Sequence, residues 1–158
     1  MTNTLNRQIQ LLARPANYPK ESDFDLVESP VPEPREGEVL VKAIWLSLDP
    51  YQRGRMRAIH PYATPMELGQ VIVGGVVGKI IRSRTPAFSV GEVVEGPLGW
   101  QEFAVSDGNN LRRVDPSLGP LSTALGILGM PGMTAYFGFL EIGQPRPGDT
   151  VEIGRAHV

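Results

Sequence analysis

Residues 47–56, which read SLDPYQRGRM, gather a phenol at Tyr51, a carboxylate at Asp49 and two guanidinium groups. They follow a predicted strand, and segments that connect the elements of a rigid scaffold often carry binding groups. Such a set can hold a polar small molecule by hydrogen bonds and charge. The same residues leave a structural role open, in which Asp49 caps neighbouring amides and the arginines face water.

Several other chemistries lack the residues that they need. Cysteine is absent, which excludes disulfides, thiol nucleophiles and thiolate metal ligands. The only histidines, His60 and His157, cannot by themselves supply a three-ligand catalytic zinc site, so no metal site is expected. The sequence has no GxSxG elbow and no Walker loop, so hydrolase chemistry has no support.

The glycines of residues 73–78, VGGVVG, superficially resemble a phosphate-binding loop. A dinucleotide-binding loop lies between a strand and a helix whose N-terminus receives the pyrophosphate. Here the glycines lie inside an apolar run that predicts a strand. We therefore interpret them as a bulge or a sharp bend in that strand.

Composition predicts one domain of ordinary size that binds neither nucleic acid nor membranes. Fifteen basic and seventeen acidic residues among 158 give a net charge of −2, with no block of basic residues. The most apolar stretch, residues 71–81, is far shorter than the ~20 residues of a membrane helix. The N-terminus lacks the apolar core of a signal peptide, so a cytoplasmic protein is expected.

Short β-branched runs separated by turn residues predict a mainly β fold. Eighteen glycines and fifteen prolines are spread along the chain and divide it into short segments. This pattern is typical of an irregular β-barrel or sandwich. The expected strands cover residues 7–13, 24–30, 39–46, 71–83, 92–95 and 101–106.

After residue 116 the pattern favours helices. A short helix is expected at residues 121–127, and a longer one begins at Pro131. Its apolar residues recur at helical spacing and form one stripe that needs a partner surface. Residues 150–153 predict the start of another strand. The stripe consists of Met133, Tyr136, Phe137 and Leu140.

Five sequence motifs between Arg7 and Val151 provide a further line of evidence. They read PEPREGEVLVK, SLDPYQRGRM, GQVIVGGVVGKII, GWQEFAV and LGILGMPGMTAYFGFLEIGQPRPGDTV. In this order they closely resemble the medium-chain reductases that reduce enone double bonds. That group includes curcumin reductases, prostaglandin/leukotriene reductases and plant double-bond reductases.

The resemblance implies a mainly β protein with short helices. A GroES-like β-barrel would occupy residues 1–130, and residues 131–151 would begin a Rossmann cofactor domain. NADPH and a small-molecule enone would meet between the two domains, and the full-length protein would be a homodimer. Zinc-dependent relatives place a cysteine where this chain has Asp49, Pro50 and Tyr51, so the resemblance implies the zinc-free branch.

The resemblance also assigns site residues. Tyr51 matches a tyrosine that lines the substrate pocket, and Tyr62 matches a second one downstream. Met130 and Thr134 match contacts to the nicotinamide end of the cofactor. The implied reaction is hydride transfer to the β-carbon of an α,β-unsaturated carbonyl, followed by protonation at the α-carbon. Tyr51 is the expected catalytic donor to the carbonyl oxygen, with Tyr62 in support.

The chain departs from the family after residue 151. The family continues into a strand and a Gly-rich loop, whereas residues 152–158 do not resemble it, so His157 receives no role. The NADPH site is therefore expected to be incomplete and binding by the isolated chain negligible. The apolar stripe would be exposed or folded back on the barrel. Two alternatives stay open: a quinone or aldehyde reductase of the same superfamily, and a non-catalytic β-barrel binding module.

Overall fold

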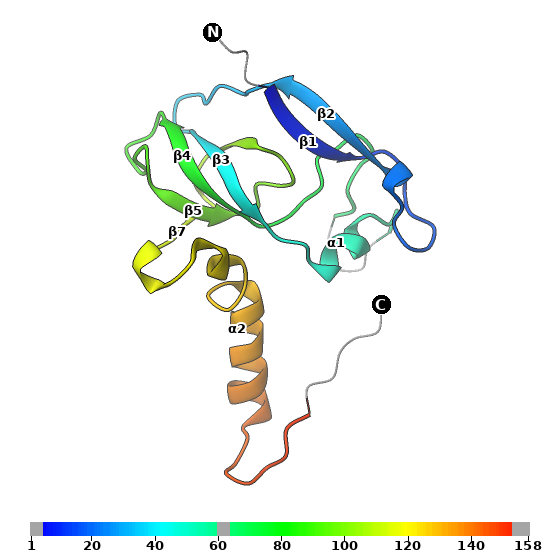
Figure 1. Ribbon diagram of the computed structural model, residues 1–158, viewed down its shortest axis with the longest axis vertical. Coiled ribbons are helices and arrows are strands. Elements are labelled where there is room, and N and C mark those ends of the chain that lie inside the picture. The colour runs from blue at the N-terminus through cyan, green and yellow to red at the C-terminus, as the bar shows by residue number, and fades with distance from the viewer. Residues whose placement is uncertain (1–4, 60–63, 153–158) are drawn as a thin grey trace.

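Two antiparallel sheets make up most of the structure, a computed structural model that describes residues 5–59 and 64–152. A hairpin pairs β1 with β2, and a five-stranded sheet follows the order β6-β3-β4-β5-β7 (Figure 1). The expected mainly β fold with short helices is confirmed. The strands are β1 (Leu5–Leu11), β2 (Phe24–Pro30), β3 (Val39–Leu46), β4 (Val76–Ser83), β5 (Val93–Gly96), β6 (Phe103–Ser106) and β7 (Arg112–Arg113).

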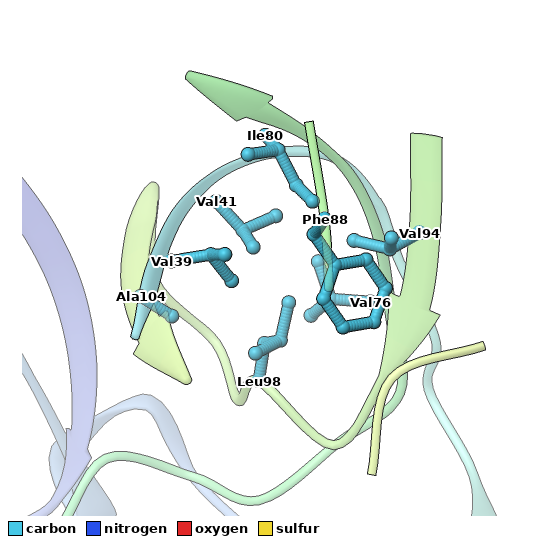
Figure 2. Packing of buried hydrophobic residues seen from close by; sticks show 8 residues of the cluster. All are labelled: Val39, Val41, Val76, Ile80, Phe88, Val94, Leu98 and Ala104. Atoms are coloured by element: carbon cyan, nitrogen blue, oxygen red, sulfur yellow. The ribbon is translucent and has the colours of Figure 1, made fainter. Parts of the chain in front are cut away.

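The curved five-stranded sheet encloses the main apolar core. Side chains from β3, β4, β5 and β6 meet inside it, together with Phe88 and Leu98 from connecting segments (Figure 2). A second cluster lies under the hairpin and contains Leu11, Met56 and Ile72. The fully buried amide of Asn6 joins the hairpin to β6, since it donates to the carbonyl of Phe103 and accepts from its N–H, both at 2.9 Å. The hairpin is thereby fixed against the barrel.

The strand expected at residues 71–83 is shorter than predicted and begins at Val76. Before that point the backbone bonds to three different segments, at Ile9, Ser47 and residues 99–100, instead of one ladder. Ile72 N–H donates to Ile9 O and Ile72 O accepts from Trp100 N–H, each at 2.9 Å. Opposite Gly78 the register is irregular, but the extra residue there is Ile44 of β3, so the bulge expected in the glycine-containing strand lies in its partner at this point.

The helices are short and lie outside the sheets. The helix expected at residues 121–127 is instead a 3-10 turn, η3 (Leu121–Leu125), because its N–H groups reach carbonyls three residues back. The helix expected at Pro131 is confirmed as α2 (Met130–Tyr136), which continues as π-helical turns in η4 (Phe137–Gly143). The remaining helices are η1 (Glu21–Asp23), α1 (Pro50–Arg55) and η2 (Pro116–Leu118).

The apolar stripe of this last helix is exposed. Met133, Tyr136 and Phe137 keep 54%, 52% and 50% of their surface accessible, and the helix points away from the barrel (Figure 1). Of the two outcomes expected for the stripe, exposure is the one observed. The helices in the described parts of the chain are all too short or too polar to cross a membrane.

The strand expected at residues 150–153 was a wrong prediction within the described residues. Thr150, Val151 and Glu152 form no strand, and position 153 lies outside those residues. A strand exists only where a neighbouring chain segment accepts its backbone hydrogen bonds, and no described strand lies beside this segment.

Candidate functional site

A cavity of about 160 Å³ lies where the barrel meets the beginning of α2. Three parts of the chain line it: residues 47–51 at the start of α1, Gly75 with residues 95–97, and residues 124–131. The cavity therefore brings together segments that are far apart in the sequence. Its polar groups are the Ser47 hydroxyl, the carboxylates of Asp49 and Glu95, and the phenol of Tyr51.

A larger cavity, of about 420 Å³, lies between the hairpin and β3. Its walls are mainly apolar and include Ile9, Trp45 and Trp100, and its two charged groups, Arg7 and Glu102, are paired with each other at 2.6 Å. We place the candidate site in the smaller cavity because a phenol, two carboxylates and a thioether converge there. Size alone does not make a site, whereas convergent polar groups can orient a ligand.

The segment expected to be a loop or turn forms the short helix α1. Asp49 has an extended backbone, and Pro50 follows in the first helical turn, where its fixed φ suits a helix and its missing N–H costs nothing. The side-chain oxygen of Gln52 accepts from the Asp49 N–H at 2.9 Å, and the Ser47 hydroxyl donates to the Asp49 carboxylate at 2.6 Å. These bonds fix the start of the helix beside the cavity.

The arginines of this segment do not simply face water, contrary to the structural alternative considered above. Arg53 Nη2 donates to the carbonyls of Pro15 and Asn17, and Arg55 Nε donates to the carbonyl of Thr64. Carbonyl oxygens at the ends of loops need donors when they are removed from water. Both guanidinium groups therefore fasten loops to α1.

Tyr51 stands at the edge of the cavity with 40% of its surface exposed. Partial burial raises the pKa of its phenol above the usual value of 10.0, and the Asp49 carboxylate raises it further, while Arg55 acts in the opposite direction. Burial and a neighbouring negative charge both disfavour the phenolate. Tyr51 is therefore a neutral hydrogen-bond donor at physiological pH.

Of the other predicted site residues, the structure places one at the cavity and one outside it. Met130 lines the same cavity as Tyr51, and Thr134 lies one turn further along α2, where its hydroxyl donates to the Met130 carbonyl at 2.8 Å. Thr134 does not line the cavity. Tyr62 lies outside the described residues. Two of the four predicted residues are thus brought together, and the contacts of all four with ligands stay predictions.

Sequence reasoning did not single out Glu95, which the fold brings to the cavity. Its carboxylate accepts from Arg112 Nε at 3.3 Å, and Arg112 Nη2 donates to the carbonyl of Leu128 at 3.2 Å, just before Met130. The pair depends on the antiparallel register of β5 with β7, for which no local motif exists. Within residues 5–59 and 64–152, no three His, Cys, Asp or Glu side chains gather into a candidate metal site.

Comparison with known proteins shows the family. Residues 7–114 match a family model described as the N-terminal domain of oxidoreductase. The chain belongs to this oxidoreductase family. The match covers the β part, from the hairpin through β7, and therefore includes the Tyr51 and Glu95 sides of the cavity.

Similar proteins extend the match into α2. The chain is 42% identical to the NADPH-dependent curcumin reductase of Escherichia coli, over 96% of this chain and 44% of that protein. It is 40% identical to the NADP-dependent 2-alkenal reductase of Nicotiana tabacum, over 96% of the chain and 46% of the relative. CurA of Vibrio vulnificus, solved in complex with NADPH, superposes with a TM-score of 0.83 at 46% identity, over 90% and 42% of the two chains. These matches confirm the assignment of the chain to this reductase group that its sequence motifs predicted. The chain spans less than half the length of these relatives.

Proposed function

We propose that the whole protein to which this chain belongs is an NADPH-dependent oxidoreductase that reduces the C=C bond of α,β-unsaturated carbonyl compounds. Relatives named for curcumin and for 2-alkenals support this substrate class, since a 2-alkenal is an α,β-unsaturated aldehyde. The observation that carries the proposal is the cavity in which the neutral Tyr51 phenol and Met130 lie together.

The residues around the cavity fit one end of NADPH. Met130 and Pro131 give the cavity an apolar wall, which suits a flat nicotinamide ring, and the Thr134 hydroxyl stands one turn beyond. We propose that Met130 and Thr134 contact this end of the cofactor. NADPH, when bound, supplies the hydride for the β-carbon of the substrate.

The chain's own residues have to orient the substrate and stabilise charge. Tyr51 donates a hydrogen bond to the carbonyl oxygen, and this bond strengthens as the oxygen becomes negative. The proton that the α-carbon receives comes from solvent through the open side of the cavity. We propose that the Tyr51 phenol, at the edge of the cavity, is the group that polarises the carbonyl. We also propose a cytoplasmic homodimer with a cofactor domain that begins near residue 131.

Replacing Tyr51 by Phe in the whole protein tests this function. Removal of one preorganised donor to an oxyanion costs about 10²-fold to 10³-fold in kcat. We expect Tyr51→Phe to lower kcat/KM for a 2-alkenal by about 10²-fold, measured as NADPH oxidation. Tyr18→Phe is the matched control, since Tyr18 lines a separate cavity and should leave turnover unchanged.

The outcome that would refute the donor role is an unchanged turnover of the Tyr51→Phe enzyme. Quinones and saturated aldehydes, assayed beside enones, separate this proposal from the other hydride acceptors that the superfamily could use. Faster NADPH oxidation with a quinone than with every enone tested would replace the enone as the substrate class.

A further inference from the structure

Gln52 is the only side chain that α1 buries, with 3% of its surface exposed. The other long side chains of this helix, those of Tyr51, Arg53 and Arg55, stay partly or largely accessible. A helix of six residues is not stable by itself, so outside contacts must hold it. A buried amide is costly unless its hydrogen bonds are made, and that cost makes Gln52 a specific point of attachment.

All the hydrogens of the Gln52 amide are used. Nε2 donates to the Ser47 carbonyl at 3.1 Å and to the Val73 carbonyl at 3.0 Å. Oε1 accepts from the Asp49 N–H at 2.9 Å, as described above. The reversed amide would set an oxygen against two carbonyl oxygens, so the network fixes a single orientation. One side chain thereby connects α1 to its own beginning and to the chain before β4.

Gly74 leaves the room that this amide occupies. A Cβ at position 74 would lie 2.7 Å from Gln52 Nε2 and 2.8 Å from Trp100 Nε1, closer than carbon and nitrogen can approach. The glycine and the buried amide therefore depend on each other. This gives a steric reason for one of the glycines in the VGGVVG run.

The hydrogen bonds of Gln52 reach chain segments that also line the candidate site. Ser47, whose carbonyl accepts from Gln52, and Gly75, two positions after Val73, both face the cavity, and their backbones are joined by a bond from Ser47 N–H to Gly75 O at 2.8 Å. We propose that Gln52 is a positioning residue: its amide fastens α1 to the chain at Val73 and so sets where the Tyr51 phenol lies over the cavity. This inference rests on the proposed function of Tyr51.

A double-mutant cycle in the whole protein tests this coupling. Gln52→Met keeps the length of the side chain but removes the three hydrogen bonds. Because small displacements of a catalytic group can cost up to 10²-fold, we expect kcat/KM for a 2-alkenal to fall by about tenfold or more. In the Tyr51→Phe background the same change should cost less than about twofold, because the group that Gln52 positions is already absent.

A purely structural role for Gln52 gives a different result. The loss in kcat/KM would then be the same in both backgrounds, and that equality would overturn the proposal. Gln101→Met is the control, since this amide also makes side-chain bonds, to Leu98 O and from Gln8, but lies away from the cavity. It should lower the melting temperature without changing kcat/KM.

A second measurement needs no reductase activity and so separates this inference from the proposed function. The pKa of the Tyr51 phenol can be followed by NMR titration of the chain with labelled tyrosine. Gln52→Met should move it down toward 10, since a looser α1 admits water to the phenol, and Gln101→Met should not move it. Gly74→Ala displaces the amide from the opposite side and gives the same test if Gln52→Met does not fold. An unmoved Tyr51 pKa in a folded variant would overturn the inference even if Tyr51 proves catalytic.

Discussion

At the scale of single residues, the groups that surround a side chain decide its chemistry more than its residue type does. Tyr51 and Tyr18 are both partly exposed phenols, yet only Tyr51 borders the cavity beside two carboxylates. Glu95 and Glu102 are both carboxylates paired with an arginine, and they lie in different cavities. The function of each residue therefore depends on which distant segment the fold brings beside it.

The Arg7–Glu102 pair predicts a pH dependence of stability. Arg7 Nη2 donates to the Glu102 carboxylate at 2.6 Å and holds its pKa below the usual 4.5. A carboxyl whose pKa is lowered on folding stabilises the protein above its unfolded pKa, and the contribution is lost as the pH falls through the lowered value. Urea unfolding of Glu102→Gln should therefore show a smaller decline in the free energy of unfolding between about pH 5 and pH 3.

The control for this measurement is Glu67→Gln. Glu67 forms no ion pair within the described residues, so this variant should keep the pH profile of the parent chain. Identical slopes for the parent chain and for Glu102→Gln would show that the pair does not contribute to acid stability.

At the scale of elements, close approach between strands explains why β4 contains a glycine. A Cβ at Gly78 would contact Val41 and lie 2.7 Å from the Lys42 carbonyl oxygen, at the place where the register of β3 with β4 is irregular. A side chain there would push the two strands apart. Gly138, in the π-helical turns of η4, has no atom within 4 Å of the corresponding position.

The same substitution should consequently have opposite effects at the two glycines. Gly78→Ala should destabilise the chain by about 1–3 kcal/mol through overpacking. Gly138→Ala should stabilise the helix by roughly 0.5–1 kcal/mol, because alanine loses less backbone entropy than glycine. Chemical denaturation of the first variant and helix content of the second check these values. A stable Gly78→Ala chain would mean that β3 and β4 can separate at the bulge without cost.

At the scale of the whole molecule, the last helix leaves a large apolar surface uncovered. Phe137, Leu140 and Ile142 are 50%, 46% and 82% exposed, and the segment extends from the barrel without a described partner (Figure 1). Contiguous apolar surface of this kind marks a contact site or leads to association.

Purified at high concentration, the 158-residue chain should therefore self-associate through this helix. Phe137→Lys together with Leu140→Lys should shift it toward monomer in sedimentation velocity, because charges are costly to bury in an apolar contact. Thr150→Lys adds a charge outside the stripe and should leave association unchanged. Equal association of the double variant and the parent chain would show that another surface forms the contact.

The sequence by itself determined the parts of this protein that depend on local patterns. Alternation and turn residues gave five strands close to their observed places, and helical spacing with Pro131 gave the beginning of α2 to within one residue. Sequence motifs identified the reductase group and indicated Tyr51 and Met130 as candidate site residues. These features are local because strand alternation, helix starts and family motifs each depend on neighbouring residues in the chain.

Only the tertiary structure decided where β4 begins and which groups form the cavity. Residues 71–75 have the apolar pattern of a strand, but their backbone bonds go to Ile9, to Ser47 and to residues 99–100, which no local pattern specifies. Glu95 reaches the cavity through strand register, and Gln52 is buried because Val73 and Gly74 leave a space for its amide. Hydrogen bonds and steric fit between distant segments exist only after the chain has folded, so they have no counterpart in sequence spacing.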